Sequence, residues 1–180
     1  MRLAILDRDG VINYDSDQFV KSPEEFRLIP GSAEAIARLN HAGYHVVVAS
    51  NQSGVGRGLF DMATLNAIHA KMHKQVAQAG GRIDAVFFCP HAAESLCQCR
   101  KPRPGLFREI ATRLHVDLAG VPAVGDALRD IEAALAVGAK PLLVKTGKGL
   151  RTLQGGSLPE GVPVYEDLRE AANIIISETD

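Results

Sequence analysis

The feature that most constrains the fold is a regular alternation between short apolar runs and longer segments of helical periodicity. The apolar runs predict strands over Leu3–Leu6, His45–Ala49, Ala85–Phe88, Val121–Val124 and Pro141–Val144. Apolar residues recur at i, i+3 and i+4 in the intervening segments, which predicts helices over Ala33–His41, Met62–Ala79, Gly105–Leu114 and Arg129–Val137, with a last helix near Asp167–Ile176. This alternation predicts an α/β fold, a Rossmann-like doubly wound parallel sheet with helices on both faces.

Length and composition indicate one domain, spanning residues 1–180. With 180 residues, of which 46% are hydrophobic, the chain can bury one substantial core. The formal net charge of −1 indicates no preference for nucleic acid or for a membrane surface. No apolar run approaches the ~20 residues of a membrane span, and the N-terminus lacks the layout of a signal peptide. We therefore expect a cytoplasmic protein that acts as a monomer on a small molecule.

Two connections lack the periodicity of an element. The segment 10–30 is long for a link between a first strand and its helix, and long ordered connections are often functional. We expect it to form a flap over the site, because the chain has no room for a separate cap domain. The segment Leu150–Pro163 is rich in Gly and Pro and is expected to be a loop.

The first apolar run leads directly into two acids, Asp7 and Asp9, with Gly10 immediately after them. Strand alternation turns both carboxylates to one side of the sheet and turns Arg8 away. Two carboxylates this close repel each other unless a cation lies between them or one of them binds a proton. The alternative for an isolated pair of this kind is a strand-end turn with solvated acids.

Polar residues also follow two later strands, and parallel sheets bind ligands beyond the carboxyl ends of their strands. The Ser50 hydroxyl and the small polar residues after it can donate hydrogen bonds to a phosphoryl group, although an ordinary polar loop is the alternative. Asp126 can ligate a hard cation, and Asp130, four residues further along a helix, can orient its neighbours. For Asp126 alone, a helix N-cap is the alternative.

Several basic residues and histidines occur near these strand ends. Arg57 lies in a glycine-rich loop and is suited to recognising an anion. Lys101 is expected near the sheet edge, whereas Arg103 is expected on a solvated loop. His69 and His73 are spaced i, i+4, as metal ligands can be, but we expect surface histidines. The segment Lys145–Lys148 is expected to be a solvated loop at a strand end, and a basic wall of the pocket is the alternative.

All three cysteines lie within one short segment, in the pattern C-x-H-x5-C-x-C. Cys89, His91, Cys97 and Cys99 can close a tetrahedral Zn²⁺ site. Four protein ligands leave no open coordination position, so this zinc would be structural and would order the loop 89–104. A chance cluster of buried cysteines is the alternative.

The motifs together carry a resemblance. D-x-D-G at the first strand, Ser50 at the second, Lys101 before a helix, and G-D-x3-D at a later strand resemble the haloacid dehalogenase-like phosphatases, over nearly the whole chain. The zinc loop, with N-Q-S-G-V-G-R-G upstream, is similar to a capless branch of that family that removes the 7-phosphate from a heptose 1,7-bisphosphate. The histidinol-phosphate phosphatases share the zinc loop and are the alternative, but Asn51 to Gly58 favour the heptose branch. Ala127 departs from the pattern, since the family often has a polar residue there.

The resemblance implies a Mg²⁺-dependent phosphatase of carbohydrate metabolism, acting in the biosynthesis of ADP-heptose, a lipopolysaccharide core precursor. Asp7 would be the nucleophile that forms an aspartyl-phosphate, ionised at an ordinary pKa near ~4. Asp9 would act as general acid and base. Mg²⁺ would be held by Asp7, the main-chain carbonyl of Asp9 and Asp126, with Asp130 behind them.

The phosphate and the remainder of the substrate would be held by polar and basic groups. Ser50 and Lys101 would stabilise the charge on the phosphoryl oxygens. Contacts to the rest of a phosphorylated sugar would come from Asn51, Arg57, Arg100 and Lys101. Two other classes stay open from the residues alone: a non-enzymatic phosphoacceptor domain and a binding module built on the zinc loop.

Overall fold

The computed structural model describes residues 1–179, so Asp180, the last residue of the predicted domain, lies outside the described residues. The predicted strands are confirmed, each within two residues of its expected bounds. The strands are β1 (Arg2–Leu6), β2 (Tyr44–Asn51), β3 (Ala85–Cys89), β4 (Pro122–Gly125), β5 (Lys140–Val144) and β6 (Val164–Tyr165). The helices are η1 (Pro23–Glu25), α1 (Ser32–His41), α2 (Ser53–Gly56), α3 (Met62–Gln78), α4 (Gly105–Leu114), α5 (Leu128–Leu135), α6 (Gly149–Gln154) and α7 (Leu168–Ser177).

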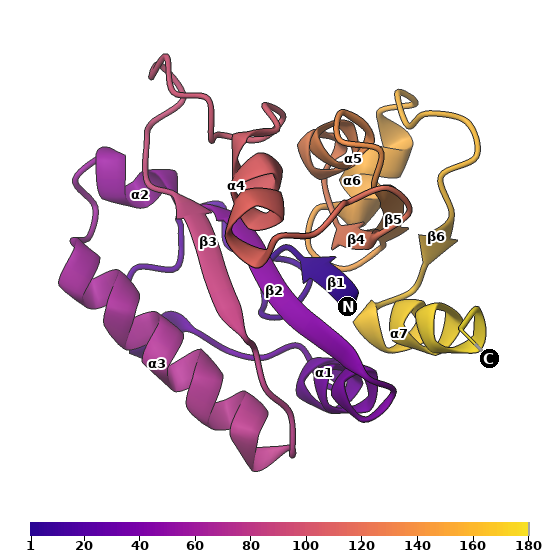
Figure 1. The fold of residues 1–180 in the computed structure, drawn as a ribbon. Helices are drawn as coiled ribbons and strands as arrows, with labels where there is room; N and C mark the ends of the chain where they lie inside the picture. The colour runs from indigo at the N-terminus through magenta and orange to yellow at the C-terminus, as the bar shows by residue number, and fades with distance from the viewer. Residues whose placement is uncertain (180) are drawn as a thin grey trace.

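The six strands form one parallel sheet in the order β3-β2-β1-β4-β5-β6, which confirms the predicted fold class. The first strand is central, and later strands add on both sides of it (Figure 1). The strand order reverses next to β1, and a reversal of this kind opens a crevice beyond the carboxyl ends of the strands.

Alternating residues of β1 point into two separate cores. Ala4 and Leu6 pack into a cluster with buried residues of α1, α3 and α7. Leu3 and Ile5 pack into a second cluster with buried residues of α4 and α5. Both faces of the sheet are therefore covered by helices, and β1 is a continuous apolar run because it is buried on both sides.

The register of the central strands fixes which polar residues meet. Leu6 is level with Val48 on β2 and with Val124 on β4. The backbone N–H of Asp7 continues the pairing by donating to the Val124 carbonyl at 2.9 Å. The residues that follow these three strands therefore emerge at one edge of the sheet.

The structure corrects the prediction for the segment after β5. Residues 149–154 form the short helix α6, which overlaps the start of the predicted loop Leu150–Pro163. Only Gly149 of α6 is buried, so the helix has no apolar stripe from which periodicity could predict it. The Thr152 hydroxyl instead anchors α6 by donating to the Asp126 carbonyl at 2.8 Å.

The segment predicted as a flap is packed at both of its ends. Ile12 and Phe26 are fully buried, and Asn13 forms an antiparallel bridge to Leu28. The exposed middle of the segment carries Asp15 and Phe19 at the carboxyl edge of the sheet, where both line a cavity.

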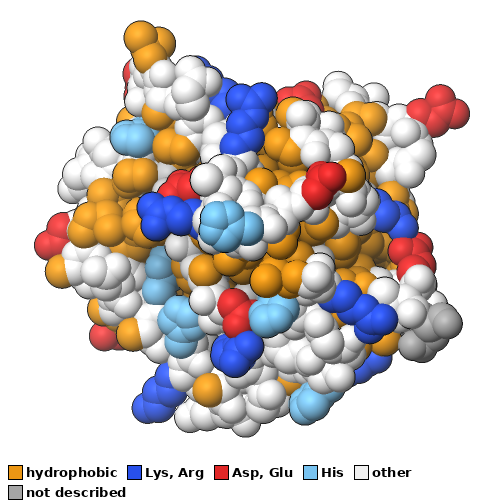
Figure 2. Space-filling model, in the orientation of Figure 1, with side chains coloured by type: hydrophobic (Ala, Val, Ile, Leu, Met, Phe, Trp, Pro, Cys, Tyr) orange, Lys and Arg blue, Asp and Glu red, His pale blue; other side chains and the backbone are white. Residues whose placement is uncertain are grey.

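The molecular surface shows no segregation of charge on the face seen in Figure 2, where acidic and basic side chains are interspersed. Among residues 1–179, no helix combines the length and the apolar character needed to cross a membrane.

Candidate active site

A polar cavity of about 270 Å³ opens at the carboxyl edge of the sheet. Most of the residues predicted to touch a substrate line it, namely Asp7, Asp9, Asn51, Arg57, Arg100 and Lys101. Ser50 and Asp126 are each only 1% exposed and do not line the cavity. The structure thus brings together residues from β1, β2 and the loops after β3 and β4.

A buried lysine lies between two buried carboxylates at the floor of this cavity. Lys101 Nζ is 3.1 Å from an oxygen of Asp7 and 2.7 Å from an oxygen of Asp130. It also donates to the Ala49 carbonyl at 2.7 Å. Two ion pairs and one hydrogen bond therefore hold the ammonium charge of Lys101 in one place.

Burial and charge set the protonation of this cluster. Burial, with the nearby charge of Asp130, raises the pKa of Asp7 to about 6 in the protein without a metal ion. The expectation of an ordinary pKa for Asp7 is therefore wrong for this state. Burial opposes the charged form of Lys101, but the carboxylates of Asp130 and Asp7 outweigh it and raise the lysine pKa.

The acids at the strand ends fit a divalent cation. Ligand oxygens of Asp7, Asp126 and Asp130 lie within 4.8 Å of one another. Asp126 Oδ1 is buried with no hydrogen-bond partner, whereas Oδ2 accepts from the Lys148 backbone N–H at 2.8 Å. Burial and the charge of Asp7 raise the pKa of Asp126 well above its usual value. A hard cation such as Mg²⁺ would satisfy the free oxygen and offset the repulsion between the acids.

Asp130 has different partners from Asp126, and they suit the supporting role predicted for it. Its Oδ2 accepts from the backbone N–H groups of Asp126 and Ala127, both at 3.1 Å. Ala127, the residue that departs from the family pattern, is 7% exposed and meets Asp130 through its backbone. Burial opposes ionisation of Asp130, but the charge of Lys101 outweighs it and lowers the pKa of this carboxyl.

The close approach of Gly10 to the Asp126 carboxylate allows a test of the cation site. At Gly10 a φ of +87° disfavours side chains, and a Cβ placed there would collide with the Asp126 carboxylate. We expect Gly10→Ala to weaken Mg²⁺ binding by at least about 10-fold, a loss of ~1.4 kcal/mol. Gly43→Ala is the matched control, since Gly43 has the same φ and only Arg2 within 4 Å of the added Cβ. Calorimetric titration with Mg²⁺ would contradict this account if both variants lost affinity equally.

The Asp9 carboxylate has a full set of partners, and one of them corrects a prediction. Arg8 does not turn away from both acids: its Nε and Nη2 donate to Asp9 Oδ1 at 3.1 and 2.8 Å. Asn13 Nδ2 donates to the same oxygen at 2.8 Å, and Gln52 Nε2 donates to Oδ2 at 2.9 Å. Burial opposes ionisation of Asp9, but the Arg8 charge and these hydrogen bonds hold its pKa below the usual value.

The carboxyl end of β2 is bonded to the residues around Lys101. Asn51 donates from Nδ2 to the Lys101 carbonyl and accepts from the Lys101 N–H at Oδ1, both at 3.0 Å. Ser50 Oγ accepts from Gln52 Nε2 at 2.8 Å, so its own proton stays free to donate. Asn51 therefore positions the Lys101 backbone while it also faces the cavity.

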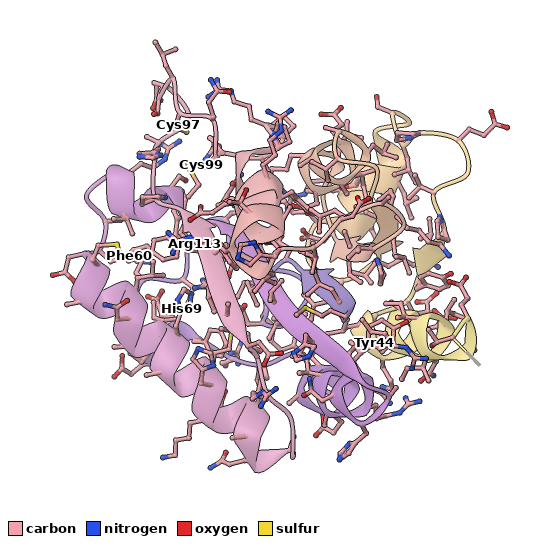
Figure 3. All side chains as sticks on the ribbon, in the orientation of Figure 1. Tyr44, Phe60, His69, Cys97, Cys99 and Arg113 are labelled. Atoms are coloured by element: carbon pink, nitrogen blue, oxygen red, sulfur yellow. The ribbon has the colours of Figure 1, made fainter. Side chains whose placement is uncertain are left out.

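The four predicted zinc ligands lie together. Figure 3 shows two of them, Cys97 and Cys99, in the segment between β3 and α4. His91 Nδ1 is 3.4 Å from Cys89 Sγ and 3.3 Å from Cys99 Sγ, and the sulfurs of Cys89 and Cys97 are 3.7 Å apart. A tetrahedron with Zn–S of about 2.3 Å and Zn–N of about 2.0 Å has edges of roughly this length. The cluster is therefore compatible with zinc.

Three expectations about basic residues and histidines are wrong. Arg103 is half-buried and donates to the carbonyls of Ser95 and Cys97, so it supports the zinc loop. His69 is only 7% exposed, whereas His73 is exposed as expected. The segment 145–148 is not a free loop, because Lys148 Nζ pairs with Asp15 at 2.8 Å.

Asp15, Gln52, Arg129 and Lys148 are among the lining residues that the sequence did not single out as site residues. Arg129 lies between two acids of the motif G-D-x3-D, and its Nε is buried without a partner. Its position in that motif was a usable indication. The contact between Lys148 and Asp15 had no such indication, because these residues meet only through the fold.

Comparison with known proteins matches this chain along its whole length. A HAD-hydrolase-like family model matches residues 98–171. The D-glycero-beta-D-manno-heptose-1,7-bisphosphate 7-phosphatase of Bordetella bronchiseptica is 60% identical over 178 residues, covering 99% of both chains. The protein of the same name from Pseudomonas putida is 53% identical, covering 98% of this chain and 100% of that one.

Solved structures give the same result. A D,D-heptose 1,7-bisphosphate phosphatase from B. bronchiseptica, complexed with magnesium and phosphate, superposes with a TM-score of 0.97 at 60% identity over 99% of both chains. A D,D-heptose 1,7-bisphosphate phosphatase from Burkholderia thailandensis has a TM-score of 0.79 at 54% identity, covering 98% of this chain and 99% of that one.

Proposed function

We propose a function that starts from the family: this chain belongs to the haloacid dehalogenase-like phosphatases, in the group of the D-glycero-beta-D-manno-heptose-1,7-bisphosphate 7-phosphatases. Its proposed reaction is the Mg²⁺-dependent removal of the 7-phosphate from D-glycero-D-manno-heptose 1,7-bisphosphate, in the biosynthesis of ADP-heptose for lipopolysaccharide. The observation that carries the substrate is the 60% identity over 99% of both chains to an enzyme of that name.

The first chemical step forms a bond between an Asp7 carboxylate oxygen and phosphorus while the bond from phosphorus to the sugar oxygen breaks. Asp9 gives its proton to the departing oxygen. The pKa of Asp9 is lowered in the protein without substrate. The negative charge of a dianionic phosphate beside Asp9 raises this pKa and favours the protonated carboxyl. The products of this step are the dephosphorylated sugar position and an aspartyl-phosphate on Asp7.

In the second step water attacks phosphorus and gives one proton to the Asp9 carboxylate. The bond from phosphorus to Asp7 breaks, which regenerates the Asp7 carboxylate and releases inorganic phosphate. The low pKa of Asp9 leaves this base ionised, and Arg8, Asn13 and Gln52 fix its orientation. A bound Mg²⁺ would neutralise phosphoryl charge, held by Asp7, Asp126 and the Asp9 main chain.

Protein groups around Asp7 are suited to stabilising the transferred phosphoryl group. The Lys101 ammonium lies 3.1 Å from an Asp7 oxygen, and the proton of Ser50 is free to donate. A preorganised ammonium and hydroxyl aimed at developing charge lower the barrier without moving during the reaction. Asp130 supports this arrangement by holding Lys101 and the Asp126 backbone.

Arg57 and Arg100 are proposed to bind the second phosphate of the substrate. Both line the cavity, and Arg100 has a buried Nη1 without a partner. We expect Arg57→Ala and Arg100→Ala each to raise KM for the bisphosphate at least about 10-fold, the loss of one charged contact. Turnover of p-nitrophenyl phosphate, which has no second phosphate, should stay within about twofold. Arg113→Ala, an exposed arginine of α4, is the control. If the variants changed KM by the same factor for both substrates, relative to the unsubstituted protein, the arginines would be excluded from this role.

The substrate itself is tested by comparing heptose bisphosphate with histidinol phosphate at equal concentrations. A kcat/KM for heptose bisphosphate at least 100-fold above that for histidinol phosphate supports the proposal. Equal or higher efficiency on histidinol phosphate would overturn it. Binding of phosphate to the chain without repeated turnover on any substrate would instead favour a phosphoacceptor domain.

A further inference from the structure

Arg8 is a buried arginine that the proposed reaction does not use directly. Its side chain is 0% exposed, although it lies between the two acids of D-x-D. A guanidinium has five N–H donors and no acceptor, so burying it requires acceptors on several sides. The two residues that meet it besides Asp9 come from elements remote in sequence, His69 of α3 and Phe26 of the segment 10–30.

His69 supplies an acceptor that the guanidinium needs. Arg8 Nη1 lies 3.0 Å from His69 Nε2, and because arginine only donates, Nε2 must accept. Burial and the positive charge of Arg8 lower the pKa of His69 to about 3, which keeps the ring neutral. The imidazole proton is then on Nδ1.

Apolar rings fix the positions of both side chains. The His69 ring lies 6.2 Å from the Phe88 ring of β3, between α3 and the sheet (Figure 3). The Arg8 guanidinium lies over the Phe26 ring, 5.8 Å from its centroid. Packing of this kind restricts rotamers, so the guanidinium can present Nε and Nη2 to Asp9 in one geometry.

We propose that Arg8, held by His69, is the positioning residue that sets the rotamer of the Asp9 carboxylate for proton transfer. Arg8 and Asn13 bind Oδ1, which leaves Oδ2 with the single Gln52 contact on the cavity side. A substrate oxygen or a water molecule can then exchange a proton with Oδ2. This inference rests on the proposed role of Asp9 and extends the site to a histidine on α3.

The test compares three variants of the full chain. His69→Leu removes the acceptor and leaves an Arg8 N–H buried without a partner, whereas His69→Gln keeps an acceptor oxygen. His73→Leu, one turn along α3 and exposed, is the control. We expect His69→Leu to lower kcat for heptose bisphosphate at least about 10-fold with KM within twofold. His69→Gln should recover most of that loss, and His73→Leu should match the unsubstituted protein.

A second substrate separates positioning from general damage. The leaving group of p-nitrophenyl phosphate departs without a proton, so its release in a single turnover should fall less than about threefold in His69→Leu. Mg²⁺ affinity, measured by calorimetric titration, should be unchanged. Equal losses on both substrates, weakened Mg²⁺ binding, or identical behaviour of His69→Leu and His69→Gln would overturn the proposal.

The outcome is distinguishable from failure of the proposed function. If the unsubstituted protein turns over heptose bisphosphate and His69→Leu equals it, the Arg8–His69 inference fails alone. If the unsubstituted protein hydrolyses histidinol phosphate but not heptose bisphosphate, the substrate assignment fails and the same comparison is read on histidinol phosphate, also an alkyl ester. If it hydrolyses neither ester, the proposed function fails and the inference, which depends on Asp9 chemistry, fails with it.

Discussion

Asp7→Asn is expected to lower kcat for heptose bisphosphate by a factor on the order of 10⁴ or more, since loss of the proposed covalent nucleophile removes the reaction path itself. The introduced amide has the same shape as the carboxylate, and its oxygen would still accept from Lys101 Nζ, which lies 3.1 Å from the native Asp7 oxygen. The fold should therefore persist. Steady-state phosphate release, with Mg²⁺ in excess, measures the effect.

Although Asp7→Asn should lower kcat, it should raise the stability of the protein without a metal ion. Because burial and Asp130 raise the pKa of Asp7 to about 6, the ionised carboxylate destabilises the native state above that pH. The sign follows from the unfolded chain, where the carboxyl ionises near 3.8 and incurs no such cost. Asp7→Asn should thus raise the melting temperature at pH 7.5 without Mg²⁺ and lose most of the stabilisation that Mg²⁺ gives. A variant that melted lower than the unsubstituted protein under both conditions would contradict this account.

If the Cys/His cluster holds zinc, as proposed, Cys97→Ser is expected to release that zinc and to lower kcat/KM at least about 100-fold. The reason is distance along the chain: Lys101 follows the ligand Cys99 by two residues, and the zinc loop has little apolar content. Coordination by zinc contributes on the order of 10 kcal/mol to ordering small domains. Without it, the Lys101 ammonium would lose its fixed place against Asp7 and Asp130. Loss of one preorganised donor lowers kcat by about 10²-fold or more.

The control for this prediction lies in the same loop. Leu96 is 89% exposed and contacts no ligand, so Leu96→Ala should keep both zinc and activity. Metal content by mass spectrometry and activity are measured on the same samples. A Cys97→Ser variant that lost zinc but kept full activity would show that the loop does not position Lys101.

The sequence was sufficient to predict the sheet edge and most of the groups that meet there. Strand ends are readable because a buried parallel strand is a continuous apolar run, and the polar residue after it marks the carboxyl edge. That is why Asp7, Ser50 and Asp126 were expected together, and the helix Gly105–Leu114 was predicted with the bounds that it has.

Two of the errors have the same physical origin, which is contact between residues remote in sequence. The sequence indicates a surface position for His69, yet α3 packs this histidine against Arg8 and Phe88. Lys148 was assigned to a solvated loop, yet it reaches Asp15 across the cavity. Neither partner lies within a helical or strand period of the residue, so periodicity carries no information about them.

The central claim is that Asp7 carries the phosphoryl group during turnover. Quenching the enzyme in acid within one turnover of heptose bisphosphate, followed by borohydride reduction, converts an aspartyl-phosphate to homoserine, which peptide mass spectrometry locates. We predict homoserine at position 7, dependent on substrate and Mg²⁺. Homoserine at another aspartate, or none at any position while phosphate is released at the full rate, would contradict the account.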